Sequence, residues 1–410
     1  MRVTVVGGGV IGLACAWYLQ RGGADVVVLE RDRVGQAASR GNAGWITPGL
    51  SNPIPAPGVM AQALRWALEP ESPLLLRPRL DPAFLAWCWR FWRVSRRAPY
   101  LEGMRALLAL NARTLELFDE LQADGVEFEM HADGLLFLFL SDEALTEELE
   151  VLHQLEREGY AGEAIALSRS ELQTLEPAVG GRVSGGIHAK LERHVRPETL
   201  TAGLAAAVRR GGGDVRESTE VQDIERKGGS WCVRTTDDEV SAERVVVAGG
   251  AWTAQVLARL GVRIRQEPAK GYSITAEGEG TKPRLPLYFG EAKVGCSPFD
   301  DGVRLAGTLE LAGIDLSIDQ RRLDAVARSA ATYLEDWRPV RPDLEWVGLR
   351  PLPADSLPLI GRAPGHEGLF IATGHGMLGI TLAPATGAAL APLVLEDRLV
   401  PELEPLRLDR

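Results

Sequence analysis

Cysteine is scarce in this chain, and its distribution argues against two kinds of stabilising site. Only four cysteines occur among the 410 residues, with no CxxC pair and no histidine at a zinc-ligand spacing. A disulfide framework or a structural metal site needs such pairs or clusters. We therefore expect a reducing compartment and no metal. The four residues are Cys15, Cys88, Cys232 and Cys296.

An excess of basic charge and long apolar runs are also lacking. The formal net charge is −11, which argues against a nucleic-acid partner, because a phosphate backbone needs a positive face. The longest apolar runs, such as LLFLFL at 135–140, are too short to span a bilayer. No charged leader precedes the first apolar strand. These features predict a cytoplasmic protein.

The signatures of several reaction classes are missing as well. The chain has no GxSxG, no Walker lysine and no HExxH, and none of its thiols has a neighbouring histidine. Nucleophilic, phosphoryl-transfer and metal-dependent chemistry are therefore disfavoured. A chain of this length is too long for one hydrophobic core and predicts two domains.

What is present begins with the stretch VTVVGGGVIGLACAWYL. Residues 3–6 predict a buried strand and 13–19 a helix, with the glycines of a GxGxxG motif between them. Gly7 allows a tight turn, Gly9 lets a pyrophosphate approach the backbone, and Gly12 lets the helix pack on the strand. The positive N-terminus of the helix faces the turn. The pattern predicts an anion site.

A second predicted strand narrows the choice of anion to a dinucleotide. Residues 26–29 form an apolar run that ends in Glu30, which would accept hydrogen bonds from ribose hydroxyl groups. An acid at this place disfavours NADP, because a 2′-phosphate needs a basic partner. The residues leave NAD and FAD open.

Five sequence blocks then carry a resemblance to a known family. They are VGQAASRGNAGWITPG, ERHVRPETLTAGLAAAVRRGG, RVVVAGGAWTAQVLARLG, PAKGYSIT and VGLRPLPADSLPLIGRAPGHEGLFIATGHGMLGITLAPATG. Together with the glycine motif, they make the chain resemble the FAD-dependent D-amino acid dehydrogenase family, within the D-amino acid oxidase and glycine oxidase superfamily. The resemblance implies FAD as cofactor. It also implies an α/β fold, in which a Rossmann-like FAD-binding domain is interleaved with an α+β substrate domain built on a mainly antiparallel sheet.

Composition and resemblance together divide the chain into five segments. The FAD-binding domain is expected to comprise 1–50, 186–262 and 345–410, and the substrate domain 51–185 and 263–344. This arrangement would place the first substrate segment over the flavin.

Periodicity places several elements within these segments. The stretch 126–140 alternates and predicts a hairpin that turns at Asp133-Gly134 and forms an edge of the substrate sheet. Helices are expected at 143–160, 197–210 and 319–335.

The block GHGMLGIT predicts a second anion site. Backbone N–H groups of 377–380 and the dipole of the following helix would point at one negative charge, such as that of a reduced flavin. His375 is the candidate general base by residue type. The resemblance instead implies that it belongs to the flavin-facing turn, and a neutral amine needs no protein base. His194 is expected to be structural, and no constellation is expected around His131, His153, His188 or His366.

Two residues are expected to hold the substrate. The GLRP segment puts Arg350 between a strand and a proline-stiffened loop, and a guanidinium group can pair with a carboxylate through two hydrogen bonds. The resemblance implies that Arg350 binds the substrate α-carboxylate. Tyr272 would add a second hydrogen bond, with a core tyrosine as the alternative. Met377 stands where glycine oxidase-like proteins carry an additional arginine, which disfavours glycine and sarcosine.

The expected cofactor site combines the motifs with the resemblance. Val221 would donate its backbone N–H to adenine, and Ser39 and Asn42 would bond the pyrophosphate or the flavin ring. No cysteine follows the GLRP segment, so we expect FAD to be bound noncovalently. The full set comprises Gly7, Gly9, Val10, Ile11, Gly12, Glu30, Arg31, Ala38, Ser39, Asn42, Ala43, Gly44, Val221, Gly249, Gly250, Trp252, Gly374, Gly376, Met377, Leu378, Gly379 and Ile380.

The implied reaction is oxidative deamination of D-amino acids to 2-oxo acids and ammonia, by hydride transfer from the α-carbon to flavin N5. Oxygen, a quinone or an electron carrier would then accept the electrons. A secondary amine such as D-proline, hydroxy-D-proline or sarcosine, or glycine itself, is the alternative substrate. A noncatalytic or RNA-modifying flavoprotein is disfavoured, because neither a basic surface nor a nucleic-acid domain is visible.

One segment bears on the electron acceptor. AWCWRFWRVSRRAPY at 86–100 interleaves tryptophans with arginines, a pattern typical of a helix that rests on a membrane interface. That interpretation predicts peripheral contact with the inner face of a membrane, where a quinone is within reach. The alternative is a helix that packs its tryptophans on the substrate domain and leaves its arginines in solvent.

Overall fold

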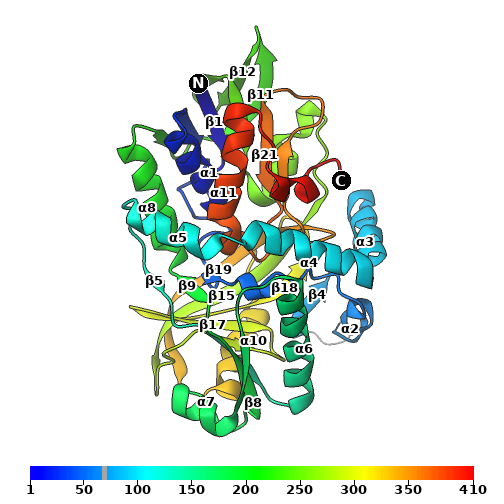
Figure 1. Cartoon of the computed structure of the whole chain (residues 1–410), viewed down its shortest axis with the longest axis vertical. Helices are drawn as coiled ribbons and strands as arrows, with labels where there is room; N and C mark the ends of the chain where they lie inside the picture. Colours follow the sequence, from blue (N-terminus) through cyan, green and yellow to red (C-terminus); the bar gives the residue numbers. More distant parts are fainter. Residues whose placement is uncertain (67–71) are drawn as a thin grey trace.

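The computed structural model describes residues 1–66 and 72–410. Residues 67–71, inside the predicted segment 51–185, lie outside the described residues. Figure 1 shows two main sheets, one in the upper half with α1 and α11, and one in the lower half with α10. The helices are α1 Val10–Arg21, α2 Val59–Trp66, α3 Pro82–Val94, α4 Arg97–Asn111, α5 Thr114–Ala123, α6 Asp142–Glu158, α7 Arg169–Leu175, α8 Pro197–Arg210, α9 Thr253–Val256, α10 Gln320–Tyr333 and α11 Gly379–Glu396.

The first sheet has the strand order β10-β2-β1-β14-β21-β20. Neighbouring strands are parallel except β20 and β21, which are antiparallel. Helices connect parallel strands of this kind, which is the α/β arrangement expected from the glycine motif. The strands are β1 Arg2–Val6, β2 Asp25–Leu29, β10 Asp214–Arg216, β14 Arg244–Val247, β20 Leu359–Arg362 and β21 Leu369–Thr373.

Both faces of this sheet are buried because successive side chains of each strand enter different cores. Val26 and Val28 of β2 pack in one core with α1, α8 and α11, whereas Val27 and Leu29 pack in the other. The second core is closed by a three-stranded antiparallel sheet, which supplies Trp231. Its strands are β11 Val221–Lys227, β12 Ser230–Thr235 and β13 Glu239–Ala242.

The larger sheet has the strand order β19-β15-β18-β17-β16-β6-β8-β7, with β4 paired to β18. All pairs are antiparallel except β16 with β6 and β18 with β4. The predicted fold class, with its mainly antiparallel second sheet, is confirmed. The strands are β4 Leu74–Leu76, β6 Leu135–Phe139, β7 Ala164–Ser168, β8 Gly185–Ala189, β15 Gln266–Glu279, β16 Leu287–Phe289, β17 Val294–Phe299, β18 Gly302–Leu311 and β19 Arg338–Pro353.

The predicted hairpin at 126–140 is wrong. Its first half forms β5 (Met130–His131), which pairs with β9 (Arg193–Val195) in a small sheet with β3 (Trp45–Ile46). Its second half forms β6, which lies inside the large sheet between β16 and β8 rather than at an edge. All five residues of β6 are buried, because the strand is covered on both faces.

Three further expectations need correction. The predicted boundary at 185/186 falls within β8, and the one at 344/345 falls within β19, and both strands belong to the large sheet. We therefore place the two points at which the chain goes back from the large sheet to the first sheet after β8 and after β19. The division into domains stays a prediction. The stretch 86–100 is not one helix, because α3 ends at Val94 and α4 begins at Arg97.

Among the described residues, α11 alone is long and apolar enough to cross a membrane by length and composition. Two thirds of it, 67%, is buried inside the protein. It packs against α1 in the core of the first sheet, so its apolar composition is explained by that burial. The helices expected at 143–160, 197–210 and 319–335 correspond to α6, α8 and α10.

Candidate active site

A single cavity is lined by parts of the chain that lie far apart in the sequence. It is bordered by the β1–α1 turn, the loop at 37–42, the start of β11, the segment 248–256, β19 and the start of α11. Most of the predicted site residues lie in this lining. They are Gly7, Gly9, Val10, Ile11, Glu30, Arg31, Ala38, Ser39, Asn42, Val221, Gly249, Gly250, Trp252, Tyr272, Arg350, Gly376, Met377, Gly379 and Ile380.

The turn between β1 and α1 has the geometry of an anion site. Gly7 has a φ of +111°, and a Cβ on Gly12 would lie 1.9 Å from the Gly7 carbonyl oxygen. Both positions therefore require glycine. The N–H of Val10 donates to Ser39 Oγ over 3.0 Å, which attaches the loop at 37–42 to the start of the helix. The positive end of α1 faces the cavity.

Glu30 directly follows β2 and lies at the same end of the cavity. Its Oε2 accepts a hydrogen bond from the Gly8 N–H at 2.7 Å, and its Oε1 accepts one from the Asp32 N–H at 3.0 Å. Each carboxylate oxygen keeps a free lone pair for a ribose hydroxyl group. The Arg31 guanidinium lies over the Trp252 ring at 4.1 Å and extends this wall.

The predicted loop residues have two different functions in the fold. Asn42 links the loop to itself, donating from Nδ2 to the Ala38 carbonyl at 3.1 Å and accepting at Oδ1 from the Gly44 N–H at 2.8 Å. A Cβ on Gly44 would lie 2.0 Å from the Val195 carbonyl oxygen, so this glycine allows packing rather than binding.

Five predicted residues lie outside the lining, namely Gly12, Ala43, Gly44, Gly374 and Leu378.

The opposite end of the cavity is formed by the turn into α11. The first helical bond there runs from the Leu382 N–H to the Leu378 carbonyl at 2.8 Å. The N–H groups of 379–381 precede that ladder and are available to a bound anion. A Cβ on Gly379 would have only His375 Cβ nearby, at 3.9 Å, so the approach to these donors is open.

His375 belongs to this turn; it is buried and also lines the cavity. Its Nε2 lies 2.9 Å from Thr386 Oγ1, and burial lowers its pKa to about 3. The imidazole is therefore neutral at physiological pH and a weak base. This agrees with an imidazole that shapes the turn and does not remove a proton. Met377, by contrast, is 61% exposed at the cavity.

Arg350 brings a positive charge into the cavity from β19. The residue lies inside a continuous strand, not between a strand and a loop as the sequence suggested. Its guanidinium occupies the space above Gly271 of β15, where a Cβ would lie 2.1 Å from Arg350 Nη1. Nη1 donates to the Thr308 carbonyl at 3.0 Å.

The charge of Arg350 is not compensated by an acid of the chain. Among the described residues it has no carboxylate within ion-pair distance. Burial lowers its pKa to about 10, so it still carries its proton at neutral pH. A buried cation without a partner is costly, and an anionic ligand in the cavity would relieve that cost.

Tyr272 also lines the cavity but already has a hydrogen-bond partner. Its hydroxyl group donates to Glu310 Oε2 at 3.0 Å, and Glu310 also pairs with Arg77 at 2.6 Å. Burial raises the pKa of Tyr272, so the phenol keeps its proton. Its oxygen can still accept a hydrogen bond, and its contact with a substrate carboxylate stays a prediction.

Several lining residues could not be found from the motifs. Trp346 is held between Gly41 and Gly348, where Cβ atoms would lie 2.2 Å and 2.1 Å from its indole ring. The two glycines, one in the predicted loop and one in GLRP, were the available signal. Gln222, next to Val221, also lines the cavity without belonging to a motif.

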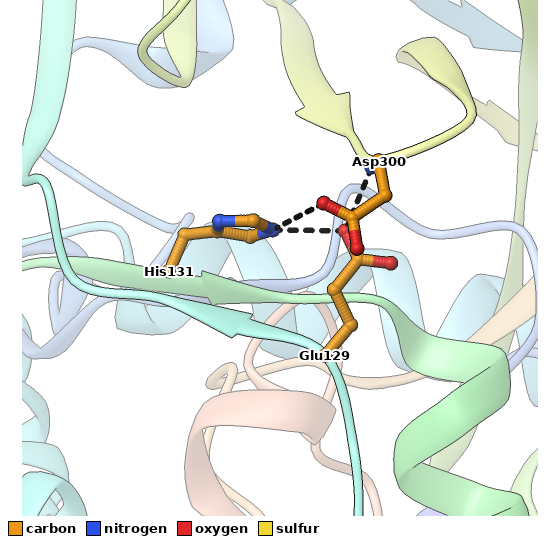
Figure 2. Close-up of side chains that lie close together, drawn as sticks. All are labelled: Glu129, His131 and Asp300. Atoms are coloured by element: carbon orange, nitrogen blue, oxygen red, sulfur yellow. Dashed lines mark hydrogen bonds and ion pairs between the residues drawn. The ribbon is translucent and has the colours of Figure 1, made fainter.

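A second cluster lies outside this cavity. Figure 2 shows His131 and Asp300 pointing toward the Glu129 carboxylate, and the sequence had indicated no constellation around His131. Glu129 Oε1 lies 2.8 Å from His131 Nε2 and accepts the Asp300 N–H at 3.1 Å. These bonds join β5 to the turn between β17 and β18, which accounts for the cluster.

Comparison with known proteins gives a consistent picture. A family model described as FAD dependent oxidoreductase, DAO, matches residues 2–393. The D-amino acid dehydrogenase of Phenylobacterium zucineum (strain HLK1) is 34% identical over 429 residues, covering 99% of each chain. That of Vibrio vulnificus (strain YJ016) is 31% identical over 410 residues, covering 97% of each. The solved glycine oxidase from Geobacillus kaustophilus superposes with a TM-score of 0.77 at 25% identity, covering 100% of this chain and 99% of that one.

Proposed function

Because the chain belongs to the DAO family of FAD-dependent oxidoreductases, we propose that it oxidises D-amino acids to 2-oxo acids and ammonia. The relatives named D-amino acid dehydrogenase support this substrate class. The observation that carries the proposal is Arg350, whose guanidinium group has no carboxylate partner among the described residues. It lies in the same cavity as the N-termini of α1 and α11. A substrate carboxylate is the ligand that this group fits.

The residues of the cavity fit FAD in an extended form. The N-terminus of α1 would hold the pyrophosphate, Glu30 the ribose, and the backbone near Val221 the adenine. The N–H groups that begin α11 would face the flavin ring. Bound FAD would supply the two-electron oxidant for the Cα–H bond. No cysteine lines the cavity in the part of the chain that the structure describes, so a noncovalent cofactor is part of the proposal.

The substrate is oriented by the protein and not activated by a base. Arg350 would bind the α-carboxylate, and the opposite side of the cavity would then receive the Cα–H bond. Among the residues that the structure describes, the carboxylates in the lining are Glu30 and Glu220, and they lie together, since the Glu30 carbonyl accepts the Thr219 N–H at 2.7 Å. Neither is placed to hold an ammonium group beside Arg350, so the amine would bind in its neutral form.

Transfer of the hydride to the oxidant that bound FAD would supply, with loss of one amine proton, would convert the amino acid to an imino acid. The steps that follow need only water. Addition of water to the C=N bond of the imino acid and loss of the nitrogen give one 2-oxo acid and one ammonia.

A secondary amine is the second candidate substrate. Among the described lining residues, no acid lies beside Arg350 to accept N–H bonds from the amine. The lining therefore suits a secondary amine as well as a primary amine. Met377 is exposed at the place where glycine oxidase-like proteins carry an additional arginine for the carboxylate, so it disfavours glycine and sarcosine.

The electron acceptor and a peripheral membrane contact form the last part of the proposal. In α3, Trp89 and Trp92 are 53% and 52% exposed, whereas Trp87 is buried and its Nε1 donates to the Leu352 carbonyl at 2.9 Å. Two half-exposed tryptophans on one helix support contact with a bilayer surface, from which a quinone could be reduced. Failure to sediment with anionic liposomes at low salt would remove this part.

The experiment that tests the function is anaerobic mixing of the yellow protein with D- and L-amino acids, D-proline, sarcosine and glycine. Flavin absorbance at about 450 nm reports reduction of the cofactor. Bleaching by a set of D-amino acids is the expected result, and readmitting air then shows whether oxygen is the acceptor. No bleaching by any of these compounds, with FAD bound, would overturn the substrate class.

A further inference from the structure

A second cavity, of about 270 Å³, lies between α3 and the segment that leads into β15. It shares no lining residue with the proposed active site. Among the described residues, its walls carry the side chains of five arginines and of one acid, in a chain whose net charge is −11. The arginines are Arg90, Arg93, Arg263, Arg265 and Arg410, and the acid is Asp355.

Asp355, the one acidic side chain that the described residues bring to this lining, is already paired. Both Asp355 oxygens lie 3.2 Å from nitrogens of the Arg410 guanidinium. Arg410 also donates to the Leu357 carbonyl at 2.7 Å, so it forms a fixed part of the wall. The charge of Asp355 is thereby balanced within the cavity wall.

The other four arginines have no carboxylate partner among the residues that the structure describes. Arg93 instead lies over the Trp89 ring, at 5.1 Å. Burial and the nearby positive charges of Arg265 and Arg93 lower the pKa of Arg90. Like charges held together in a hollow repel each other unless an anion lies between them.

We propose that Arg90, Arg93, Arg263 and Arg265 form a binding site for the phosphate group of an anionic ligand, a lipid headgroup or a free phosphate. One guanidinium is enough for a carboxylate, whereas a phosphate group offers several oxygens and up to two charges, which suits several guanidiniums. Trp89, Val94 and Leu408 give the same cavity an apolar rim that can cover the ester part. An adjoining cavity of about 310 Å³ shares Arg263, Arg265 and Arg410 and also contains Asp409, which leaves space for a substituent.

The position of the site makes both sources of phosphate reachable. Figure 1 shows α3 at the right-hand edge of the molecule. Arg263 and Arg265 are exposed, so the cavity opens to solvent on that side. The site is separate from the FAD-binding cavity, and its failure would leave the proposed reaction unaffected.

The test uses the FAD-loaded protein and a double variant, Arg263→Gln with Arg265→Gln. A control, Arg182→Gln with Arg284→Gln, removes the same charge at exposed positions outside both cavities. Titration calorimetry with inorganic phosphate, at ionic strength kept constant with sodium chloride, measures the free-phosphate arm. Flotation with phosphatidylcholine vesicles, with and without about 30% phosphatidylglycerol, measures the lipid arm.

The proposal expects binding to at least one probe, weakened on the order of ten-fold or more by the double variant and unchanged by the control. Binding of phosphate alone would assign a free ligand, and selective flotation with the anionic vesicles would assign a headgroup. Equal losses in both variants would mean a general charge effect and would overturn the site. Absence of binding to both probes would overturn it as well. Flavin absorbance of each variant confirms that it is folded and loaded.

Discussion

At the scale of single residues, the charge of Arg350 decides how the proposed substrate binds. For Arg350→Met we expect kcat/KM to fall roughly a hundred-fold, which corresponds to a loss of about 3 kcal/mol of transition-state stabilisation. The reason is that a buried, hydrogen-bonded ion pair with the carboxylate is lost. FAD content should not change, since the proposed ligand of this residue is the substrate and not the cofactor. Steady-state kinetics with a D-amino acid, together with the flavin-to-protein ratio, measures both quantities.

The variant Arg350→Lys controls for the charge itself. Lysine keeps the charge but loses the bidentate geometry, so its activity should lie between those of the wild type and the methionine variant. Unchanged kcat/KM in Arg350→Met would remove Arg350 from the site.

Gly271 determines where the Arg350 guanidinium can lie. In Gly271→Ala the new Cβ would meet Arg350 Nη1 at 2.1 Å and must displace it. We expect KM to rise about ten-fold, which corresponds to a loss on the order of 1–2 kcal/mol of substrate-binding free energy, with a smaller change in kcat. Ser273→Ala, two residues along β15 and outside the cavity lining, is the control and should leave KM unchanged. A KM that rises equally in both variants would mean a general disturbance of the strand.

At the scale of elements, the β1–α1 turn combines a binding glycine with a packing glycine. In Gly9→Ala the new Cβ would meet only Ser39 Oγ, at 3.3 Å, so the fold should tolerate it while the pyrophosphate loses its close approach. We expect FAD affinity to fall by about ten-fold or more, with little change in apoprotein stability. Fluorescence titration of the apoprotein with FAD and urea unfolding measure the two effects.

Gly12→Ala should give the opposite result. Its Cβ would lie 1.9 Å from the Gly7 carbonyl oxygen, a backbone atom that cannot move without separating α1 from β1. The expected loss of unfolding free energy is about 3 kcal/mol. If both variants lose FAD equally and neither loses stability, the two glycines do not have separate functions.

This motif also shows why part of the fold could be predicted from sequence. The strand, turn and helix of 2–21 are adjacent in the chain, and the residues that fix their geometry lie within them. β6 is different, because its partners β8 and β16 come about 50 and 150 residues later. The pattern of 126–140 contains no information about them, so its alternation was wrongly interpreted as a local hairpin.

The candidate site divides along the same line. Glu30 and Arg350 stand in recognisable motifs, and both lie in the cavity. Trp346 lies there because of the register of β15 against β19 and because Gly41 packs on its ring. Register depends on long-range pairing, which a single sequence does not reveal.

At the scale of the whole molecule, stability should depend on pH through buried histidines. Burial lowers the pKa of His194 to about 4, and its Nε2 lies 2.7 Å from the Pro298 carbonyl between the small sheet and β17. His375, with a pKa of about 3, acts in the same direction. Glu192 acts in the opposite direction, because burial raises its pKa to about 7. The unmodified protein therefore shows only the difference between these effects.

The contribution of His194 can be separated by comparison with His194→Gln. A histidine whose pKa is lowered on folding stays neutral in the folded state while the unfolded chain takes up a proton. Its contribution is therefore complete above about pH 6.5 and is lost as the pH falls toward 4. From pH 7 to pH 5 the difference in unfolding free energy between wild type and variant should shrink by about 2 kcal/mol.

Urea unfolding at pH 7, 6 and 5 measures this difference, because the effects of His375 and Glu192 are common to both proteins and cancel. His153→Gln, at an exposed position of α6, controls for the loss of an imidazole as such. A difference for His194→Gln that stays constant from pH 7 to pH 5 would show that this imidazole takes up its proton equally well in the folded state. Nδ1 of His194, which is buried and takes up that proton, would then have to reach solvent without unfolding of the rest of the molecule, which makes the small sheet a locally mobile unit and not part of the common core.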